Sequence, residues 1–530
     1  MDSTIFLVMA ALFIIVTLGL GLLAYRRVKG SDEFLLGDRN THPVILALSY
    51  GATFLSASAI VGFGGQSAKY GLSMIWLVFL NLFLGLAVAF IIFGKPTRKL
   101  GAKLGAFTFA DFLGKRFKSP SIRTFTAVIV LVGMPIYCAA VLLGGVNFLD
   151  VMLNIDRNTV LLVFAVITGI YVVYGGLIAV MYNDALQAGI MFIGMIVIFV
   201  FSIITFGGID GDINSTWNMA ITSSTKLQEL AEQGMVDWGS MPEFGSQVWL
   251  TVVTTFLMGV GIGALAQPQL VIRFMTAKDD KAMSRSLIIG SIFMIVIVGS
   301  AYTIGAFSNM FFFDRYGEVA IDHVANVDMI IPTFIVDLFS DVTFGDIFVS
   351  LFVLALLCAS ISTMSALLHV MGSSGGYDLA TVIARRKGLL DKDKDYRSLR
   401  LNRMVTAFML IVVVILAFLM PSNIIAKATS VFMGLMAATL LPAYVYALYS
   451  KGQPNKHAAI FSIAVGAVVW VVWGFFVSVS IAGVLGTPMI PMGLWNYVDP
   501  LIIALPLSAI ALLVGLRLFP DNDVAQAETA

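Results

Sequence analysis

Charged side chains are scarce in this 530-residue chain, because Lys, Arg, Asp and Glu together make up only 12% of it. Hydrophobic residues make up 59%, and the mean hydropathy is +0.96. A soluble protein of this length does not need so much apolar surface, so the composition excludes a soluble globular fold and indicates a polytopic membrane protein. The net charge of +1 does not point to nucleic acid, and we expect none as a partner.

Cysteine and histidine are also rare. The two cysteines, Cys138 and Cys358, both fall inside apolar segments, so we expect no disulfide framework. The four histidines are scattered, and the chain has neither an H-E-x-x-H sequence nor a nucleophile elbow. These absences argue against a membrane enzyme. A channel is disfavoured as well, because no ring of charges and no repeated filter loop is apparent.

Long apolar segments are what the chain has in their place. Segments of about 18 or more apolar residues mark candidate membrane spans. The first one has no basic leader and no small-residue cleavage site, so we expect a retained helix rather than a signal peptide. The sequence predicts thirteen all-α spans, at 4–25, 43–66, 72–94, 124–150, 158–175, 185–207, 246–271, 286–311, 343–371, 404–420, 424–449, 457–482 and 498–516.

Basic residues are distributed unevenly between the predicted loops. With the amino terminus outside, the inside loops and the carboxyl-terminal end hold 27 of the 32 Lys and Arg residues. The predicted outside loops at 208–245 and 313–342 lean acidic. Since basic residues gather on the cytoplasmic side of membrane proteins, the sequence predicts an amino terminus outside and a carboxyl terminus inside. An odd number of spans agrees with this orientation.

Two predicted spans, the second and the seventh, carry glycine-rich stretches at 62–65 and 259–263 that we expect to interrupt a helix. They lie five spans apart, so they can be equivalent positions in two inverted five-helix halves, which is typical of a midplane binding site. The alternative is that these glycines only serve helix packing. The predicted division is 1–42 (extra amino-terminal helix and cytoplasmic loop), 43–207 (first repeat), 208–245 (extracellular loop), 246–449 (second repeat) and 450–530 (two further helices and a short tail).

A dense hydroxyl cluster lies in the ninth predicted span, at 357–365, which reads L-C-A-S-I-S-T-M-S. Hydroxyls are costly in hydrocarbon unless they find a partner. They can bond back to their own helix or bridge to a neighbouring one. The density of the cluster, opposite a glycine-broken helix, favours a second interpretation, which is an oxygen cage for a hard cation.

Four stretches resemble the sodium:solute symporter family, and they occur in that family's order between residues 43 and 449. G-A-T-F-L-S-A-S-A-I-V-G at 51–62 resembles its first core helix. The stretch 175–187 is similar to its signature G-G-x-x-A-x-x-x-x-D-x-x-Q. Q-P-Q-L-V-I-R-F at 267–274 resembles the end of its sixth core helix, and 357–365 its eighth. The resemblance implies a LeuT-type 5+5 inverted repeat in the cell membrane and symport driven by sodium, with no other cofactor.

The resemblance also implies a sodium site. Sodium is a small, hard cation that by analogy with calcium and magnesium prefers oxygen ligands, and a broken helix leaves backbone carbonyls free. The implied ligands are the carbonyls of Ala52, Leu55 and Ala359 and the hydroxyls of Ser362 and Thr363. Residues 359, 362 and 363 share one helix face, which suits this role. The alternative is a polar seam between helices that binds no ion.

Asp184 is the one carboxylate that we single out, because acids within membrane segments are functional candidates. Some family members use this position, with hydroxyls such as Ser362 and Ser365, for a second sodium. The alternative is an acid at the start of the sixth span that caps free N–H groups.

Substrate contacts are implied more loosely, between the two broken helices. The candidates by motif position are Ala59, Gln267 and Gln269, and Lys427 enters by its place at the start of span 11. The glutamines can equally bridge helices, and Lys427 can snorkel to the outer surface. We expect His369 to be a packed polar residue rather than a proton relay.

The family's branches differ at a few of these positions. Proline carriers often have an Asp where this chain has Phe54, and sugar carriers have a Gln near Ala59. The run at 267–278 looks more like the acetate/monocarboxylate and pantothenate carriers. We therefore expect a sodium symporter for a small organic carboxylate. A proton-coupled carrier of the same fold, and a sodium symporter for an amino acid or sugar, remain the alternatives.

Overall fold

The computed structural model describes residues 3–153, 156–205, 212–391, 394–420, 425–479 and 488–520, and this part of the chain is helical. The strand-like pairing found in it is one isolated bridge between Thr41 and Ala277. The long helices are α1 (Ser3–Arg27), α8 (Pro120–Leu153), α9 (Arg157–Thr205), α15 (Asp280–Met294), α16 (Ser300–Tyr316), α19 (Gly345–Ser373), α21 (Leu399–Leu419), α22 (Ile425–Tyr449), α23 (Lys456–Val472) and α25 (Pro500–Leu518).

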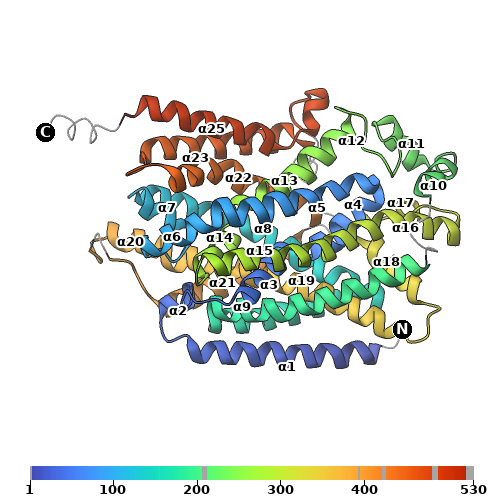
Figure 1. Ribbon diagram of the computed structural model, residues 1–530, viewed down its shortest axis with the longest axis horizontal. Helices are drawn as coiled ribbons and strands as arrows, with labels where there is room; N and C mark the ends of the chain where they lie inside the picture. The colour runs from blue at the N-terminus through green and yellow to red at the C-terminus, as the bar shows by residue number, and fades with distance from the viewer. Residues whose placement is uncertain are drawn as a thin grey trace.

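The long helices lie side by side along the longest axis of the molecule (Figure 1). Helix α1 forms one edge, and α23 and α25 form the opposite edge. Short helices gather at the two ends. One end carries α10 (Ile213–Ala220), α11 (Thr225–Glu232), α12 (Gln247–Leu250), α17 (Ala320–His323) and α18 (Ile330–Phe339), and the other carries α2 (Ser31–Leu35), α6 (Lys95–Leu104), α7 (Phe109–Arg116) and α20 (Ala380–Arg386).

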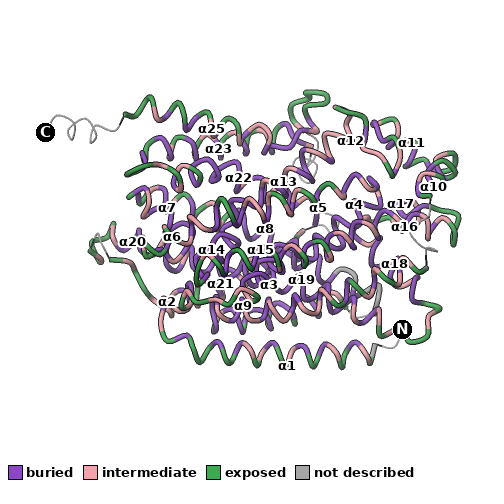
Figure 2. Tube along the Cα trace, in the orientation of Figure 1, coloured by how far each residue is buried: buried purple, intermediate pink, exposed green. Residues whose placement is uncertain are grey.

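Burial increases from the edges of the bundle toward its centre (Figure 2). The interior helix α19 is buried at every position from 352 to 373, whereas α1 and α21 present exposed apolar side chains such as Leu12 and Phe408. A helix that is apolar on all sides has to be surrounded by other helices or by lipid. Helix α19 is therefore the axis of the protein core, and the edge helices present their outer sides to the bilayer.

Eleven helices in the described ranges are long and apolar enough to cross a membrane, which makes the chain a multi-pass protein of the cell membrane. Two of these helices contain a residue outside helical geometry, Gly71 (φ 66°) in 58–104 and Gly176 (φ 54°) in α9. Glycine is required there, because a Cβ would approach the Trp238 carbonyl oxygen to 2.2 Å and the Phe34 carbonyl oxygen to 2.5 Å. Each of these helices thus changes direction at its glycine, while the count of thirteen, the orientation and the division into repeats remain predictions.

Two core helices are interrupted, but one of them not where the glycines suggested. Helix α3 (Pro43–Phe54) ends at Leu55, and the chain turns helical again from 58 to 62 and in α4 (Phe63–Tyr70). The prediction that 62–65 interrupts the helix is therefore wrong. Those glycines serve close packing instead, since a Cβ on Gly65 would lie 2.0 Å from the Val327 carbonyl oxygen.

The second interruption lies at the end of the predicted glycine stretch. Helix α13 (Gly259–Gly261) leads into a tight 3-10 turn at 263–266, and Gln267 is extended with ψ 118°. Pro268 then starts α14 (Pro268–Thr276), where its missing N–H costs nothing. The prediction of a break in the seventh span is confirmed, a few residues beyond the glycines.

Candidate ion and solute site

Backbone and hydroxyl oxygens converge where α3 ends against α19. The Ser362 hydroxyl donates to the carbonyls of Ala52 (2.8 Å) and Ala359 (3.1 Å). The Thr363 hydroxyl lies 3.4 Å from the same Ala52 oxygen and donates to the Thr53 carbonyl at 3.1 Å. All of these residues are buried. Four of the five predicted sodium ligands therefore lie together, and Leu55, the fifth, is the residue at which α3 stops.

A buried ion pair lies on another side of α3. Arg273 of α14 reaches the Asp184 carboxylate of α9 at 2.7 Å, and both side chains are fully buried. Ser49 and Thr53 of α3 donate to the same carboxylate oxygen at 2.7 and 3.3 Å, and each also accepts from Arg273. A buried charge needs such compensation, because the cost of leaving it unpaired is several kcal/mol.

This ion pair corrects two sequence interpretations. Asp184 does not cap a helix, because the second half of α9 begins at Gly176 and Asp184 lies two turns inside it. Arg273 was counted among the cytoplasmic loop residues, but it lies in the core. The only sequence signal for its role was a charged residue within the apolar motif at 267–274.

The other predicted ligands of a second sodium are not joined to Asp184. Among the described residues its hydrogen bonds go to Ser49, Thr53 and Arg273, whereas the Ser365 hydroxyl donates to the Ser362 carbonyl at 2.8 Å. The other Asp184 oxygen, Oδ1, is buried and has no hydrogen-bond partner in this part of the chain. That oxygen is free to accept a cation or a water molecule.

The predicted substrate residues fall into two groups. Gln267, at the second break, donates to the carbonyls of Gly263 (2.9 Å) and Met433 (3.3 Å), and Gln269 donates to Gln267 at 3.3 Å. Gln267 therefore bridges to α22, whereas the Gln269 side chain bonds only to Gln267, and its own Oε1 lacks a partner in the described residues. Ala59 is buried just beyond the first break, whereas Lys427 lines a separate cavity at the predicted outer end.

His369 is a packed side chain. Its Nε2 lies 3.1 Å from the Leu35 carbonyl oxygen, and its ring lies 5.5 Å from that of Phe34. A carbonyl can only accept a hydrogen bond, so Nε2 carries the proton in this contact. The geometry agrees with the expected structural role.

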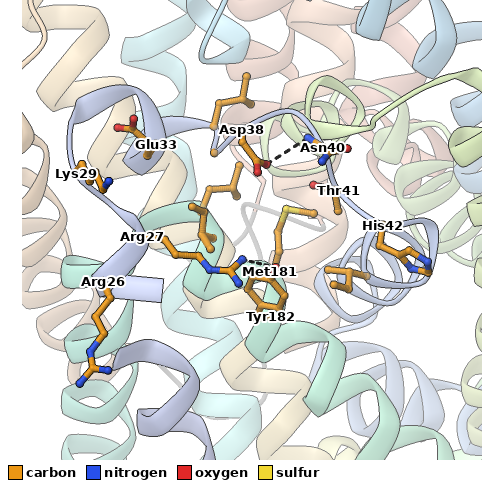
Figure 3. Close-up of a pocket in the computed structure, with 15 residues that line it drawn as sticks. Arg26, Arg27, Lys29, Glu33, Asp38, Asn40, Thr41, His42, Met181 and Tyr182 are labelled. Atoms are coloured by element: carbon orange, nitrogen blue, oxygen red, sulfur yellow. Dashed lines mark hydrogen bonds between the residues drawn. The ribbon is translucent and has the colours of Figure 1, made fainter. Parts of the chain in front are cut away.

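A cavity of about 500 Å³ opens at the predicted cytoplasmic end, between the end of α1 and α9 (Figure 3). Arg27 closes one side of it, donating to the Tyr182 hydroxyl at 3.0 Å with its guanidinium 5.6 Å from the ring centroid. Ile45 and Met181 line its inner wall. Ser49 follows Ile45 by one turn of α3, so this wall separates the cavity from the Asp184 ion pair.

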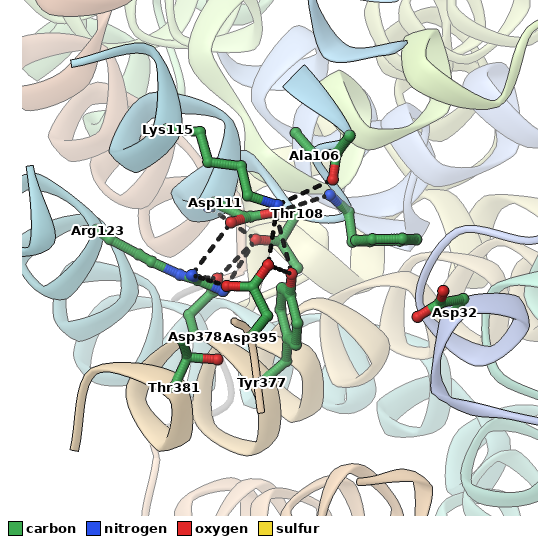
Figure 4. Close-up of polar contacts among 12 residues, drawn as sticks. Asp32, Ala106, Thr108, Asp111, Lys115, Arg123, Tyr377, Asp378, Thr381 and Asp395 are labelled. Atoms are coloured by element: carbon green, nitrogen blue, oxygen red, sulfur yellow. Dashed lines mark hydrogen bonds and ion pairs between the residues drawn. The ribbon is translucent and has the colours of Figure 1, made fainter. Parts of the chain in front are cut away.

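The same end is tied together by a buried charge network (Figure 4). Arg123 of α8 contacts Asp395 (2.8 Å), Asp378 (2.9 Å) and Asp111 of α7 (3.2 Å). Lys115 pairs with Asp111 and Asp395 at 2.8 and 3.0 Å. Burial alone would raise the pKa of Asp395, but Arg123 and Lys115 overcome this and hold that pKa below its usual range. The network fastens α7, α8 and the segment after α19 to one another.

Two interrupted helices around a buried polar centre, in a bundle of membrane helices, are the architecture of a secondary transporter. A model described as the sodium:solute symporter family matches residues 34–466. The chain belongs to the sodium:solute symporter family, whose members are transporters rather than enzymes.

Curated relatives carry the similarity over most of the chain. The sodium/pantothenate symporter of Haemophilus influenzae is 26% identical over 452 residues, which cover 84% of this chain and 86% of that protein. Sodium/proline symporter 2 of Staphylococcus saprophyticus is 25% identical, covering 88% of this chain and 86% of its own. A solved Na⁺-coupled sialic acid symporter, in a substrate-bound outward-open state, aligns with a TM-score of 0.71 at 18% identity, over 97% of this chain and 98% of that one. This structural likeness confirms the predicted LeuT-type fold.

Proposed function

We propose that the chain is a sodium-coupled symporter that imports a small organic carboxylate of the monocarboxylate or pantothenate class. The observation that carries the proposal is the set of oxygens from Ala52, Ala359, Ser362 and Thr363, which is buried at the end of α3 and contains no charged group. Neutral oxygens of this kind suit a hard monovalent cation. The pantothenate, proline and sialic acid that the relatives' names give are all carboxylic acids.

Sodium would couple to transport by joining two helices. An ion held between Ala52 of α3 and Ser362 of α19 replaces the hydrogen bond that now links them and favours the state in which α3 stays against α19. Loss of the ion on the inside would let these helices separate. The cavity beside Ile45 and Met181 is the proposed route of release, because it lies one helical turn from the buried centre.

The driving force bears on the number of ions. One charge crossing 100 mV is worth about 2.3 kcal/mol, and a tenfold sodium gradient adds about 1.4 kcal/mol. One sodium with a monoanion is electroneutral, so accumulation would then be only about tenfold. A second sodium at Asp184 Oδ1, Ser362 and Ser365 would restore the electrical driving force. The unpartnered Oδ1 supports this second site, while the ion pair with Arg273 weakens the attraction of Asp184 for a cation.

The test is uptake by purified protein in liposomes with an imposed sodium gradient. Labelled pantothenate and acetate are compared with proline and glucose, in sodium and in choline. We expect uptake of a carboxylate that requires inward sodium. Uptake of glucose alone would contradict the solute class, and equal uptake driven by a proton gradient in choline would contradict sodium coupling.

Proline is the second candidate solute, and the similarity to sodium/proline symporters favours it. Proline also carries a carboxylate, so it belongs to the same class of organic acids. Position 54 is a buried Phe beside Gly85, so it offers no carboxylate to pair with the ammonium group of proline. Uptake of proline in preference to pantothenate in the same liposomes would select this alternative.

A further inference from the structure

A cavity of about 730 Å³ opens at the predicted outer end of the bundle, above the two interrupted helices. Its walls come from α4, from the start of α12 and its continuation, from the segment around 326, from the start of α22, and from Val479 and Tyr497. The polar side chains that matter most in it are Gln66, Lys69, Tyr70, Asn326, Lys427 and Tyr497.

The charge of this cavity is of one sign. Lys69 and Lys427 line it, and among the described residues no acidic side chain does. Neither ammonium forms a salt bridge in the described part of the chain; the Lys69 ammonium lies 5.1 Å from the ring centroid of Tyr70. Lys427 interacts electrostatically with Lys69 and with Asp328, which is buried and is not among the residues that line the cavity. Two cations without a salt bridge in a partly enclosed, low-dielectric space produce a local positive potential, which Asp328 offsets only in part.

The cavity lies on the way to the first helix break. Gln66 and Lys69 are on α4, which continues the helix that restarts after Leu55. Lys427 precedes Thr429, whose hydroxyl donates to the Ser58 hydroxyl at 2.9 Å. A Cβ on Gly62 would meet Ala426 at 3.3 Å, so the helical turn at 58–62, which leads into α4, is in direct contact with α22. Lys69, which would hold the solute, therefore lies about three helical turns from Ala59.

We propose that this cavity is a carboxylate-capturing vestibule, in which Lys69 and Lys427 bind an anionic solute, without sodium, before it reaches the sodium-dependent site. The proposal rests on the proposed function in that the solute is a carboxylate. It adds a second, outer site and two residues that select for negative charge. The polar amides around the lysines, from Gln66 and Asn326, complete a lining that suits an organic acid with further hydrogen-bonding groups.

A cysteine reporter measures the charge of the cavity directly. Gln66→Cys places a thiol on its wall, and the native Cys138 and Cys358 are buried, so the new thiol is the accessible one. The reaction rates of a sulfonate-bearing and a trimethylammonium-bearing methanethiosulfonate reagent are compared, each normalised to a free thiol. We expect the anionic reagent to be favoured about tenfold. Adding Lys69→Gln and Lys427→Gln should bring the ratio to within about twofold of unity.

A ratio near unity in Gln66→Cys alone, or one that the two lysine changes leave unaltered, would overturn the proposal. The matched control is Lys226→Gln, which removes a cation that lines a different cavity at the same end and should not change the ratio. If the double lysine variant fails to fold, Lys69→Gln alone should still lower the ratio about threefold.

Ligand competition in sodium-free choline medium tests binding itself. Millimolar pantothenate should slow modification of Gln66→Cys, whereas panthenol, which has an alcohol in place of the carboxylate, should not. Acetate and acetamide form a second such pair. Equal protection by panthenol, or protection that appears only in sodium, would overturn the vestibule. If the tenfold ratio and sodium-free protection hold while liposomes show no sodium-driven carboxylate uptake, the proposed function fails and the vestibule stands.

Discussion

At the predicted cytoplasmic end, Arg123 is buried among three carboxylates and the nearby cavity contains both Glu33 and Asp38 among its basic residues. At the predicted outer end, Lys69 and Lys427 line a larger cavity, and no acidic residue of the described ranges lines it. The Arg123 network thus pairs its charges with one another, whereas the two outer lysines form no salt bridge in the described residues. Compensated charges hold elements together, whereas uncompensated ones attract a ligand of opposite sign.

This difference assigns distinct roles to the two ends. The Arg123 network, together with Tyr377, which donates to Asp395 at 2.9 Å, fixes helix ends against one another. In the outer cavity, no described acidic side chain forms a salt bridge with either lysine. Between the two ends lies a centre in which α3 contacts both the neutral oxygens around Ser362 and the compensated Asp184–Arg273 ion pair.

The largest expected effect is at the inner end. Arg123→Leu leaves Asp111, Asp378 and Asp395 buried without their shared cation, and should cost about 3–5 kcal/mol of stability. The measurement is thermal unfolding of purified protein in detergent. Arg397→Leu is the matched control, because its ion pair with Asp32 is exposed and should be worth less than about 1 kcal/mol. Equal losses of stability in both variants would show that the Arg123 network does not hold these helix ends together.

At the centre, the paired change Asp184→Asn with Arg273→Gln removes the carboxylate without leaving its arginine unpaired. If Asp184 binds a second sodium, this variant should lose the part of carboxylate accumulation that a 100 mV potential drives, about fiftyfold. Uptake in liposomes is measured with and without a potassium diffusion potential. If uptake by this variant still depended on voltage, Asp184 would not be part of a second sodium site.

The neutral oxygens are tested by Ser362→Ala combined with Thr363→Ala. Losing two of the proposed ligands should raise the sodium concentration for half-maximal uptake at least about tenfold, since a hydrogen bond to an ion is worth about 1.5–3 kcal/mol. Ser373→Ala on the same helix is the control, because its hydroxyl only bonds to the Val370 carbonyl. An unchanged sodium requirement in a folded double variant would remove this cluster from the ion site.

The contrast between the two cavities predicts that a thiol in the inner cavity prefers the anionic reagent less strongly than a thiol in the outer one. Asn40→Cys places a thiol on the inner cavity, where Glu33 and Asp38 offset Arg26, Arg27 and Lys29. The ratio of anionic to cationic reagent rates, measured in inside-out vesicles, should lie within about threefold of unity. A ratio as high as at Gln66→Cys would abolish the distinction between the two ends.

The smallest expected effect is a pH dependence of the outer cavity. Burial raises the pKa of Asp328 to about 7, and the Ile425 N–H and Lys427 only partly oppose it. Asp328 is therefore mostly neutral at pH 6 and mostly charged at pH 8, where it offsets part of the Lys427 charge. The reagent ratio at Gln66→Cys should fall about twofold over this range, and Asp328→Asn should abolish the change. If the reagent ratio changed equally with pH in the Asp328→Asn variant, the pH dependence would belong to another titrating group.

The sequence located the spans well and the interior contacts poorly. Predicted spans such as 343–371 and 424–449 correspond closely to α19 and α22, because length and hydropathy are properties of the local sequence. The first helix break was placed at the glycines of 62–65, although α3 ends at Leu55, where no glycine marks it. Glycine has two uses in a membrane helix, bending and close packing, and the sequence does not tell them apart.

The amino-acid sequence by itself determined that the chain lies in a membrane, that it carries the motifs of its family, and that Ala359, Ser362 and Thr363 share one helix face. Only the tertiary structure decided that Arg273 is buried against Asp184, 89 residues away, and that Lys69 and Lys427 line one cavity to which the described residues contribute no acid. The physical reason is that burial in the bilayer depends on each segment's own composition. The pairing or isolation of a charge depends instead on which helices the packing brings together.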